Sequence, residues 1–148
     1  MVRLGLLANP DAGLGGRLGL KGSDGQAELA RSMGAEDRSG PRLTLMLEHF
    51  SKLHRASFDD IEWLTSEGSM GTDWLPEGAK IGSISIVHSA SGGTSASDTT
   101  AAVMTLLEGG IDLLVYAGGD GTTRDIVAAL ESTGHSKTPV IGVPTGVK

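Results

Sequence analysis

Short runs of branched aliphatic residues recur along the chain and restrict its fold more than any other feature. Four clear runs and a weaker one have this character: 2–8, 81–87, 111–117, 140–143 and, more weakly, 61–65. Each run is mostly apolar, and we interpret such runs as strands covered on both faces in a parallel sheet. The runs therefore predict a buried parallel sheet.

Segments with helical spacing separate these runs. Four segments carry apolar residues at steps of three and four: 26–35, 42–54, 98–107 and 124–130. An alternation of strands and helices is typical of right-handed βαβ units. We therefore expect an α/β fold with a doubly wound, mostly parallel sheet and helices on both faces. Residues 66–78, which contain four turn-forming Gly and Pro residues, are expected to form a loop that can contain one short helical turn.

The length of 148 residues suits one domain, 1–148, with a real core, and leaves no room for a second full domain. A net charge of -6 disfavours nucleic acid as a partner, and the absence of cysteine excludes thiolate nucleophiles and thiolate metal sites. No run is long enough to span a bilayer, and the N-terminus lacks a secretory h-region, so we expect a cytoplasmic protein without a membrane partner. A homo-oligomer is compatible with the sequence, although no feature specifies one.

Glycine is enriched, with 23 residues in 148, about twice its usual share of roughly 7%. Many of these glycines lie in three loops that each follow an apolar run: 9–17, 91–94 and 118–122. Parallel strands end at one edge of a sheet, where helix N-termini present unpaired N–H groups and a partial positive charge. The loops therefore predict one ligand site at that edge, where local features hold an anion.

The loop at 118–122 reads GGDGT and has the most specific composition. Its glycines allow backbone conformations closed to other residues and let a phosphate approach the main chain, while the following helix supplies N–H donors. A carboxylate is a poor anion ligand, so Asp120 is expected either to hold Mg²⁺ or to accept a proton from an attacking hydroxyl. The competing interpretation is a tight turn in which Thr122 and Asp125 form a capping box.

The GGDGT loop resembles the signature of the NAD kinases, which belong to a superfamily with diacylglycerol and sphingosine kinases and, more distantly, phosphofructokinases. Residues 9–13, which read NPDAG, are similar to that superfamily's Asn-Pro-x-x-Gly turn. Four segments resemble the branch described as ATP- or polyphosphate-dependent NAD kinases: 13–17, 20–25, 98–99 and 122–125. The resemblance covers the chain from residue 4 to residue 148, and only the GGDGT loop is specific by itself.

The resemblance implies a phosphotransferase that moves a phosphoryl group from ATP, or from polyphosphate, to the 2′-hydroxyl of NAD with Mg²⁺. In that scheme Asp120 orients or deprotonates the 2′-hydroxyl. The residues that would bind or face the phosphates of ATP are Asn9, Gly118, Gly119, Gly121 and Thr122. The family's second domain, which is β-rich and supplies much of the NAD pocket, is expected to be absent from this chain, which we therefore interpret as a fragment.

Two more residues are candidates for phosphate contacts. Lys21 either meets a phosphoryl group or is a solvated cation in a long loop. Thr94 either contacts a ligand or belongs to the start of a helix, where Ser95 and Asp98 have capping-box spacing. The four histidines have no recognisable ligand spacing, so the sequence predicts no metal site formed by protein side chains alone.

Two other functions remain open at this stage. The GGDGT loop serves the phosphoryl donor and does not define the acceptor, so a lipid or small-alcohol kinase of the same superfamily is one alternative. A nucleotide-binding fragment without catalysis is the other. The chain has no basic amphipathic helix that would favour a lipid surface.

Overall fold

The computed structural model describes residues 1–10, 39–53, 58–89 and 96–145. Its five strands form one sheet in the order β3-β2-β1-β4-β5, and all four neighbouring pairs are parallel. The strands are β1 (Val2–Ala8), β2 (Ile61–Ser66), β3 (Ser83–His88), β4 (Leu113–Gly118) and β5 (Val140–Pro144). The chain runs outward from β1 to β3 and then crosses back to β4, which confirms the doubly wound sheet.

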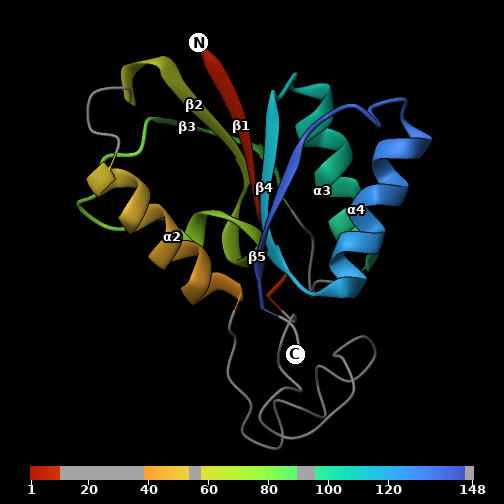
Figure 1. Cartoon of the computed structure of the whole chain (residues 1–148), viewed down its shortest axis with the longest axis horizontal. Helices are drawn as coiled ribbons and strands as arrows, with labels where there is room; N and C mark the ends of the chain where they lie inside the picture. The colour runs from red at the N-terminus through yellow and green to blue at the C-terminus, as the bar shows by residue number, and fades with distance from the viewer. Residues whose placement is uncertain (11–38, 54–57, 90–95, 146–148) are drawn as a thin grey trace, which may run out of the picture.

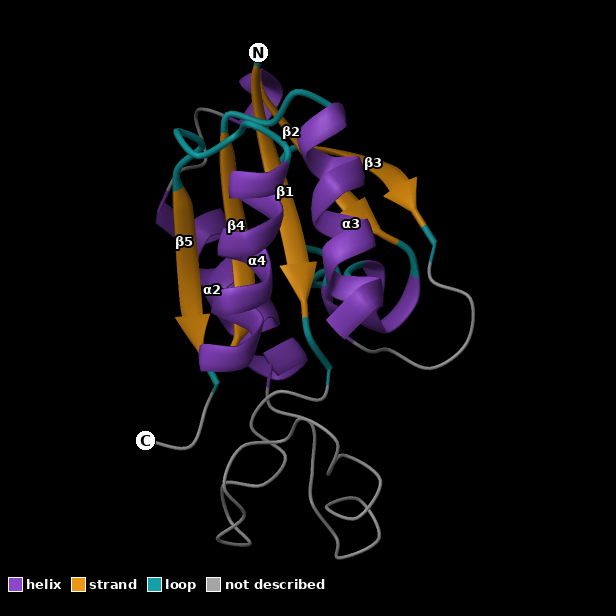
Figure 2. Cartoon of the chain, turned by 90° about the vertical axis from the view of Figure 1, so that its right-hand side faces the viewer, coloured by secondary structure: helices purple, strands orange, loops and turns teal. Residues whose placement is uncertain are grey.

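Three helices cover the two faces of this sheet. They are α2 (Ser39–Leu53), α3 (Ala96–Glu108) and α4 (Asp120–Ser132). Helix α2 lies on one face, and α3 and α4 lie side by side on the other (Figure 1), as the view turned by 90° also shows (Figure 2). The expectation of helices on both faces is confirmed. The helix predicted at 26–35 lies outside the described residues.

The central strands β1 and β4 supply both hydrophobic cores. Alternate residues of β1 point to opposite faces, so Leu6 packs in the core under α2 and Leu7 packs in the core under α3 and α4. Both side chains are almost fully buried. Helix α2 contributes Leu43 and Leu47 to its core, and α3 contributes Leu106 to the other. The apolar runs thus fit strands that are covered on both sides.

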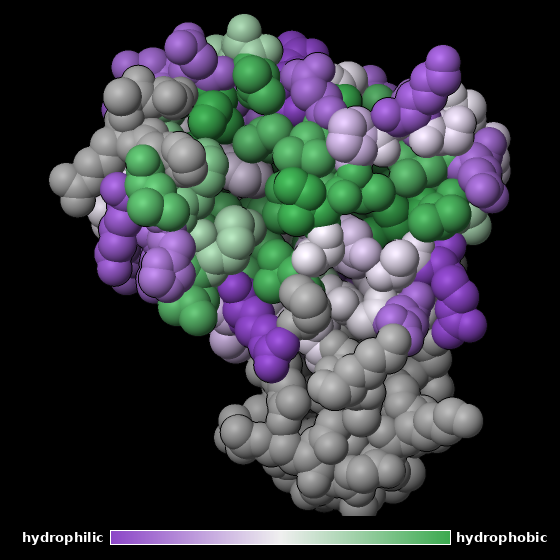
Figure 3. All heavy atoms as spheres, viewed as in Figure 1, coloured by the Kyte–Doolittle hydropathy of each residue, from purple (hydrophilic) through white to green (hydrophobic). Residues whose placement is uncertain are grey.

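The edge strands β3 and β5 depart from that expectation. In β3, Ile86 is 56% exposed, and in β5, Ile141 is 53% exposed. Both edge strands are therefore incompletely covered on the faces of the sheet, to which their side chains point. Apolar side chains consequently gather on the face of the molecule that carries β5 (Figure 3).

The segment between β2 and β3 forms the predicted loop, with two short 3-10 turns at Gly68–Met70 and Thr72–Trp74. The next strand begins at Ser83, two residues later than expected, because Gly82 has a φ of +128° that breaks the extended run. Trp63 is a packing anchor: it is 2% exposed, and its indole N–H donates to the carbonyl of Ile81 at 2.8 Å. The loop is as predicted, although it contains two short turns where one was expected.

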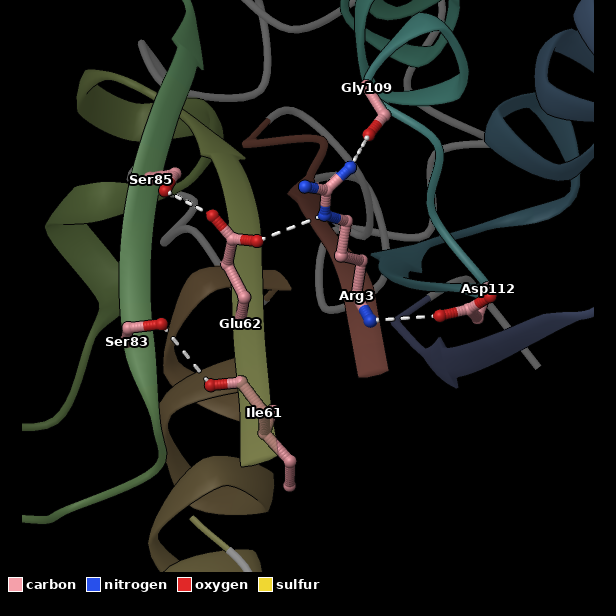
Figure 4. Close-up of polar contacts among 7 residues, drawn as sticks. All are labelled: Arg3, Ile61, Glu62, Ser83, Ser85, Gly109 and Asp112. Atoms are coloured by element: carbon pink, nitrogen blue, oxygen red, sulfur yellow. Dashed lines mark hydrogen bonds and ion pairs between the residues drawn. The ribbon is translucent and has the colours of Figure 1, made fainter. Parts of the chain in front are cut away.

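Polar side chains link three strands near their amino ends (Figure 4). The Arg3 guanidinium contacts a carboxylate oxygen of Glu62 at 3.1 Å and donates to the carbonyl of Gly109 at 3.1 Å. The other carboxylate oxygen of Glu62 accepts from the Ser85 hydroxyl at 2.8 Å, and the Arg3 backbone N–H donates to Asp112 at 2.9 Å. This network lies at the edge opposite the glycine-rich loop of β4.

Within the described residues, no helix is both long and apolar enough to cross a membrane.

The core under α2 yields a prediction about stability. Replacing Leu47, which is fully buried, by Ala should lower the free energy of unfolding by about 2–5 kcal/mol, because the substitution leaves a cavity. The same change at Leu53, which is 76% exposed at the end of the same helix, should alter it by no more than about 0.5 kcal/mol. Chemical denaturation of both variants measures the difference, and equal losses would contradict this packing.

Candidate functional site

The order of the strands places the point at which their connections reverse direction between β1 and β4. Strand β1 is followed in the sheet by β2 on one side and by β4 on the other, so the chain leaves β1 and β4 in opposite directions. Ligands of open α/β sheets bind outside the carboxyl ends of the strands at such a point. Asn9 follows β1 there, and Gly119 follows β4. The register pairs Ala8 with Ala117, so these two exits lie side by side.

Asn9 ties this edge together through three hydrogen bonds. Its backbone N–H donates to the carbonyl of Ala117 at 3.0 Å, and its side-chain amide donates to the Thr122 hydroxyl at 2.8 Å. The hydroxyl of Ser39, the first residue of α2, donates to the Asn9 carbonyl. Asn9 therefore joins the end of β1 to β4 and to the first turns of both α2 and α4.

Helix α4 begins at Asp120, directly after the strand. Gly119 is its N-cap and has no side chain that could provide a capping hydrogen bond. Thr122 is thus the third residue of the helix and Asp125 the sixth, so the alternative in which these two form a capping box is wrong. Asp120 is exposed at the first helical position, where the partial positive charge of the helix favours a carboxylate.

The glycines of this loop do not adopt an unusual backbone conformation, and Gly118 serves packing. None of Gly118, Gly119 and Gly121 has a positive φ, so the expected conformations closed to other residues are not found. A Cβ atom at Gly118 would instead lie 2.6 Å from the Cβ, Cγ2 and Oγ1 atoms of Thr122. Gly118 is therefore required because Thr122, which is 3% exposed, packs directly on the strand.

The structure brings together most of the predicted site residues that it describes, although two of them bind each other. Asn9 and Thr122 were both expected to face phosphates, and their side chains form a mutual hydrogen bond. Asp120 is exposed, and the neighbouring Gly121 is half-buried. Lys21 and Thr94 lie outside the described residues, so their proposed phosphate contacts stay predictions.

Ser39 also belongs to this edge, which was not predicted from the sequence. We expected the helix to begin at residue 42, whereas α2 begins at Ser39, which is fully buried. The signal was the Ser-Gly-Pro run at 39–41, because Pro is favoured in the first turn of a helix and Ser at its start. Gly40 is also constrained, since a Cβ atom there would lie 2.0 Å from the Trp74 ring.

The described residues contain no group of three or more His, Cys, Asp or Glu side chains that could hold a metal ion. Asp120 is the carboxylate at the start of α4, and α2 has no acidic residue in its first turn. Mg²⁺ is commonly bound by one or two carboxylates together with the phosphates of a substrate. The residues at this edge fit that mode, because the Asp120 carboxylate could bind Mg²⁺ together with phosphate oxygens of the substrate.

Comparison with known proteins gives one match. The family model of the ATP-NAD kinase N-terminal domain matches residues 4–148. No curated protein and no solved structure matches the chain. The matched region includes every described helix and all five strands, apart from the first two residues of β1.

The hydrogen bond between Asn9 and Thr122 can be tested by a double-mutant cycle. Asn9→Ala and Thr122→Val should show a coupling energy of about 0.5–1.5 kcal/mol in the free energy of unfolding, because both variants remove the same bond. Thr133→Val at the other end of α4 is the control and should be additive with Asn9→Ala. Additivity of the Asn9 and Thr122 variants would show that the bond does not form.

Proposed function

The chain belongs to the ATP-NAD kinase family, and from this membership we propose that it binds the phosphates of ATP, or of polyphosphate, and acts in phosphoryl transfer to the 2′-hydroxyl of NAD. The product of that reaction is NADP. Family membership supports a kinase, and the arrangement at the carboxyl edge supports the location of its chemistry.

The position of Asp120 is the observation that carries the proposal. This carboxylate is exposed at the first turn of α4, at the carboxyl edge of the sheet where β1 and β4 end side by side. The bond between Asn9 and Thr122 fixes the start of α4 against the end of β1. A fixed and accessible carboxylate next to helix N–H donors suits a reaction that needs a bound phosphate and a proton acceptor.

The proposed step is an in-line displacement at phosphorus. The 2′-oxygen of NAD forms a bond to the γ-phosphorus of ATP while the bond from that phosphorus to the β,γ-bridging oxygen breaks, and ADP leaves with the electron pair. Asp120 takes the proton of the 2′-hydroxyl or orients that hydroxyl. The backbone amides at the start of α4 donate hydrogen bonds to phosphate oxygens. The partial positive charge of the helix at this end favours the negatively charged phosphates.

Mg²⁺ fits this scheme through Asp120 and the phosphate oxygens of the donor. The ion neutralises charge on the transferred phosphoryl group when it is bound. In the described part of the chain, side chains alone do not gather into a metal cage, so the affinity for the ion should depend on the nucleotide.

Substitution of Asp120 tests the proposal in the complete gene product. Asp120→Asn keeps the shape of the side chain and removes its charge and its basicity. The rate of NADP formation from MgATP and NAD should fall by about 10² to 10⁴-fold. A coupled assay of NADP with purified protein measures the change.

Asp59→Asn is the matched control for this experiment. Asp59 is a highly exposed carboxylate just before β2, at the opposite edge of the sheet, and its loss should leave the rate unchanged. Near-normal turnover by Asp120→Asn would remove the catalytic assignment. Phosphorylation of a lipid or a small alcohol in place of NAD by the wild-type protein would assign the chain to another branch of the superfamily.

A further inference from the structure

Thr145 has a buried hydroxyl without a partner. The residue follows β5 directly, and it is fully buried. Its Oγ1 atom is the one buried side-chain oxygen or nitrogen in the described residues that forms no hydrogen bond. A hydroxyl removed from water without a new partner destabilises a protein, and a residue such as Val would fill the same volume without that cost. The hydroxyl therefore calls for an explanation beyond packing.

The register of the sheet places Thr145 beside the start of α4. Pro144 of β5 pairs with Gly118 of β4, so the next residues along the two strands are Thr145 and Gly119. On the other side of β4, Ala8 pairs with Ala117 and leads into Asn9. The exit of β4 toward Asp120 is thus flanked by Asn9 on one side and by Thr145 on the other.

The alternation of side chains places Thr145 on the face that α2 covers. Val143 packs against the core under α2, as does its register partner Ala117. Gly118, the partner of Pro144, faces Thr122 of α4. Continued by one residue, the same alternation returns Thr145 to the side of α2, whose first residue, Ser39, bonds to the carbonyl of Asn9.

Two helix N-termini and one unsatisfied hydroxyl thus meet at the same edge. Helix α2 packs against both β4 and β5, and α4 begins where β4 ends. The partial positive charges at both helix starts favour an anionic group between them, and a threonine hydroxyl can donate one hydrogen bond to such a group. A phosphate oxygen would supply a negative charge to the two helix starts and a hydrogen-bond acceptor to the Thr145 hydroxyl.

We propose that Thr145 is a ligand-binding residue, whose hydroxyl donates to a phosphate oxygen of a nucleotide held at the start of α4. This proposal rests on the proposed function, since it concerns the same site. Because Thr145 is covered in this structure, binding must displace the atoms that cover it. The hydroxyl gains a charged acceptor in that complex, which accounts for its presence in a buried position.

Thr145→Val tests the proposal in the complete gene product, because it keeps the shape of the side chain and removes the hydroxyl. Calorimetric titration with MgATP, NAD and inorganic tripolyphosphate should show an affinity lower by about 10- to 100-fold for at least one of them, as expected for a lost hydrogen bond to a charged group. The melting temperature without ligand should stay the same or rise. Thr145→Ser should bind within about threefold of the wild type.

Thr65→Val is the matched control. Thr65 is also fully buried, but its hydroxyl donates to the carbonyl of Leu6 at 2.8 Å. This variant should melt at a lower temperature without ligand and bind each compound as the wild type does. The control therefore separates a structural hydroxyl from one that serves a ligand.

The outcomes distinguish this proposal from the proposed function. Wild-type affinity in Thr145→Val for all three compounds, or a lower melting temperature without ligand, would overturn the role of Thr145 and leave the kinase assignment intact. A wild-type protein that binds none of the three would overturn both. Lower affinity for MgATP and tripolyphosphate would place the Thr145 contact on the phosphates of the phosphoryl donor. Lower affinity for NAD alone would place it on the pyrophosphate of NAD.

Discussion

The hydrogen bonds of Asn9 are the constraint on which the site depends. One residue holds the end of β1 to β4, to the first residue of α2 and to the third residue of α4. Each of these bonds is modest by itself, at about 0.5–1.5 kcal/mol, yet together they fix two helix starts at one edge. The position of Asp120 follows, because it is the first residue of one of those helices.

The sheet gives this edge its rigidity. Strands β1 and β4 are buried on both faces, and their side chains divide between the core under α2 and the core under α3 and α4. The Arg3 network fixes the same strands near their amino ends, away from the site. The proposed chemistry lies at the edge where the strands end, and the Arg3 network lies at the opposite edge.

The glycines illustrate how one sequence feature supports different physical explanations. The GGDGT loop predicted a site at the end of a strand, and the structure places this loop where β4 ends and α4 begins. The reason given for the glycines was wrong, because none of the three has a positive φ. Gly118 is needed since Thr122 packs directly against it, whereas Gly82 and Gly134 are the kind of glycine that supplies a left-handed turn.

The sequence by itself determined the α/β class, the approximate strands and the loop that carries Asp120. These features depend on local periodicity and composition, which a single chain displays directly. Only the tertiary structure decided that Asn9 bonds to Thr122, 113 residues away, and that the end of β5, which leads into Thr145, adjoins the end of β4. It also decided that β3 and β5 are edge strands with exposed aliphatic residues. Such contacts follow from the order and register of the strands, and residues distant in sequence carry no local signal of which strand they will adjoin.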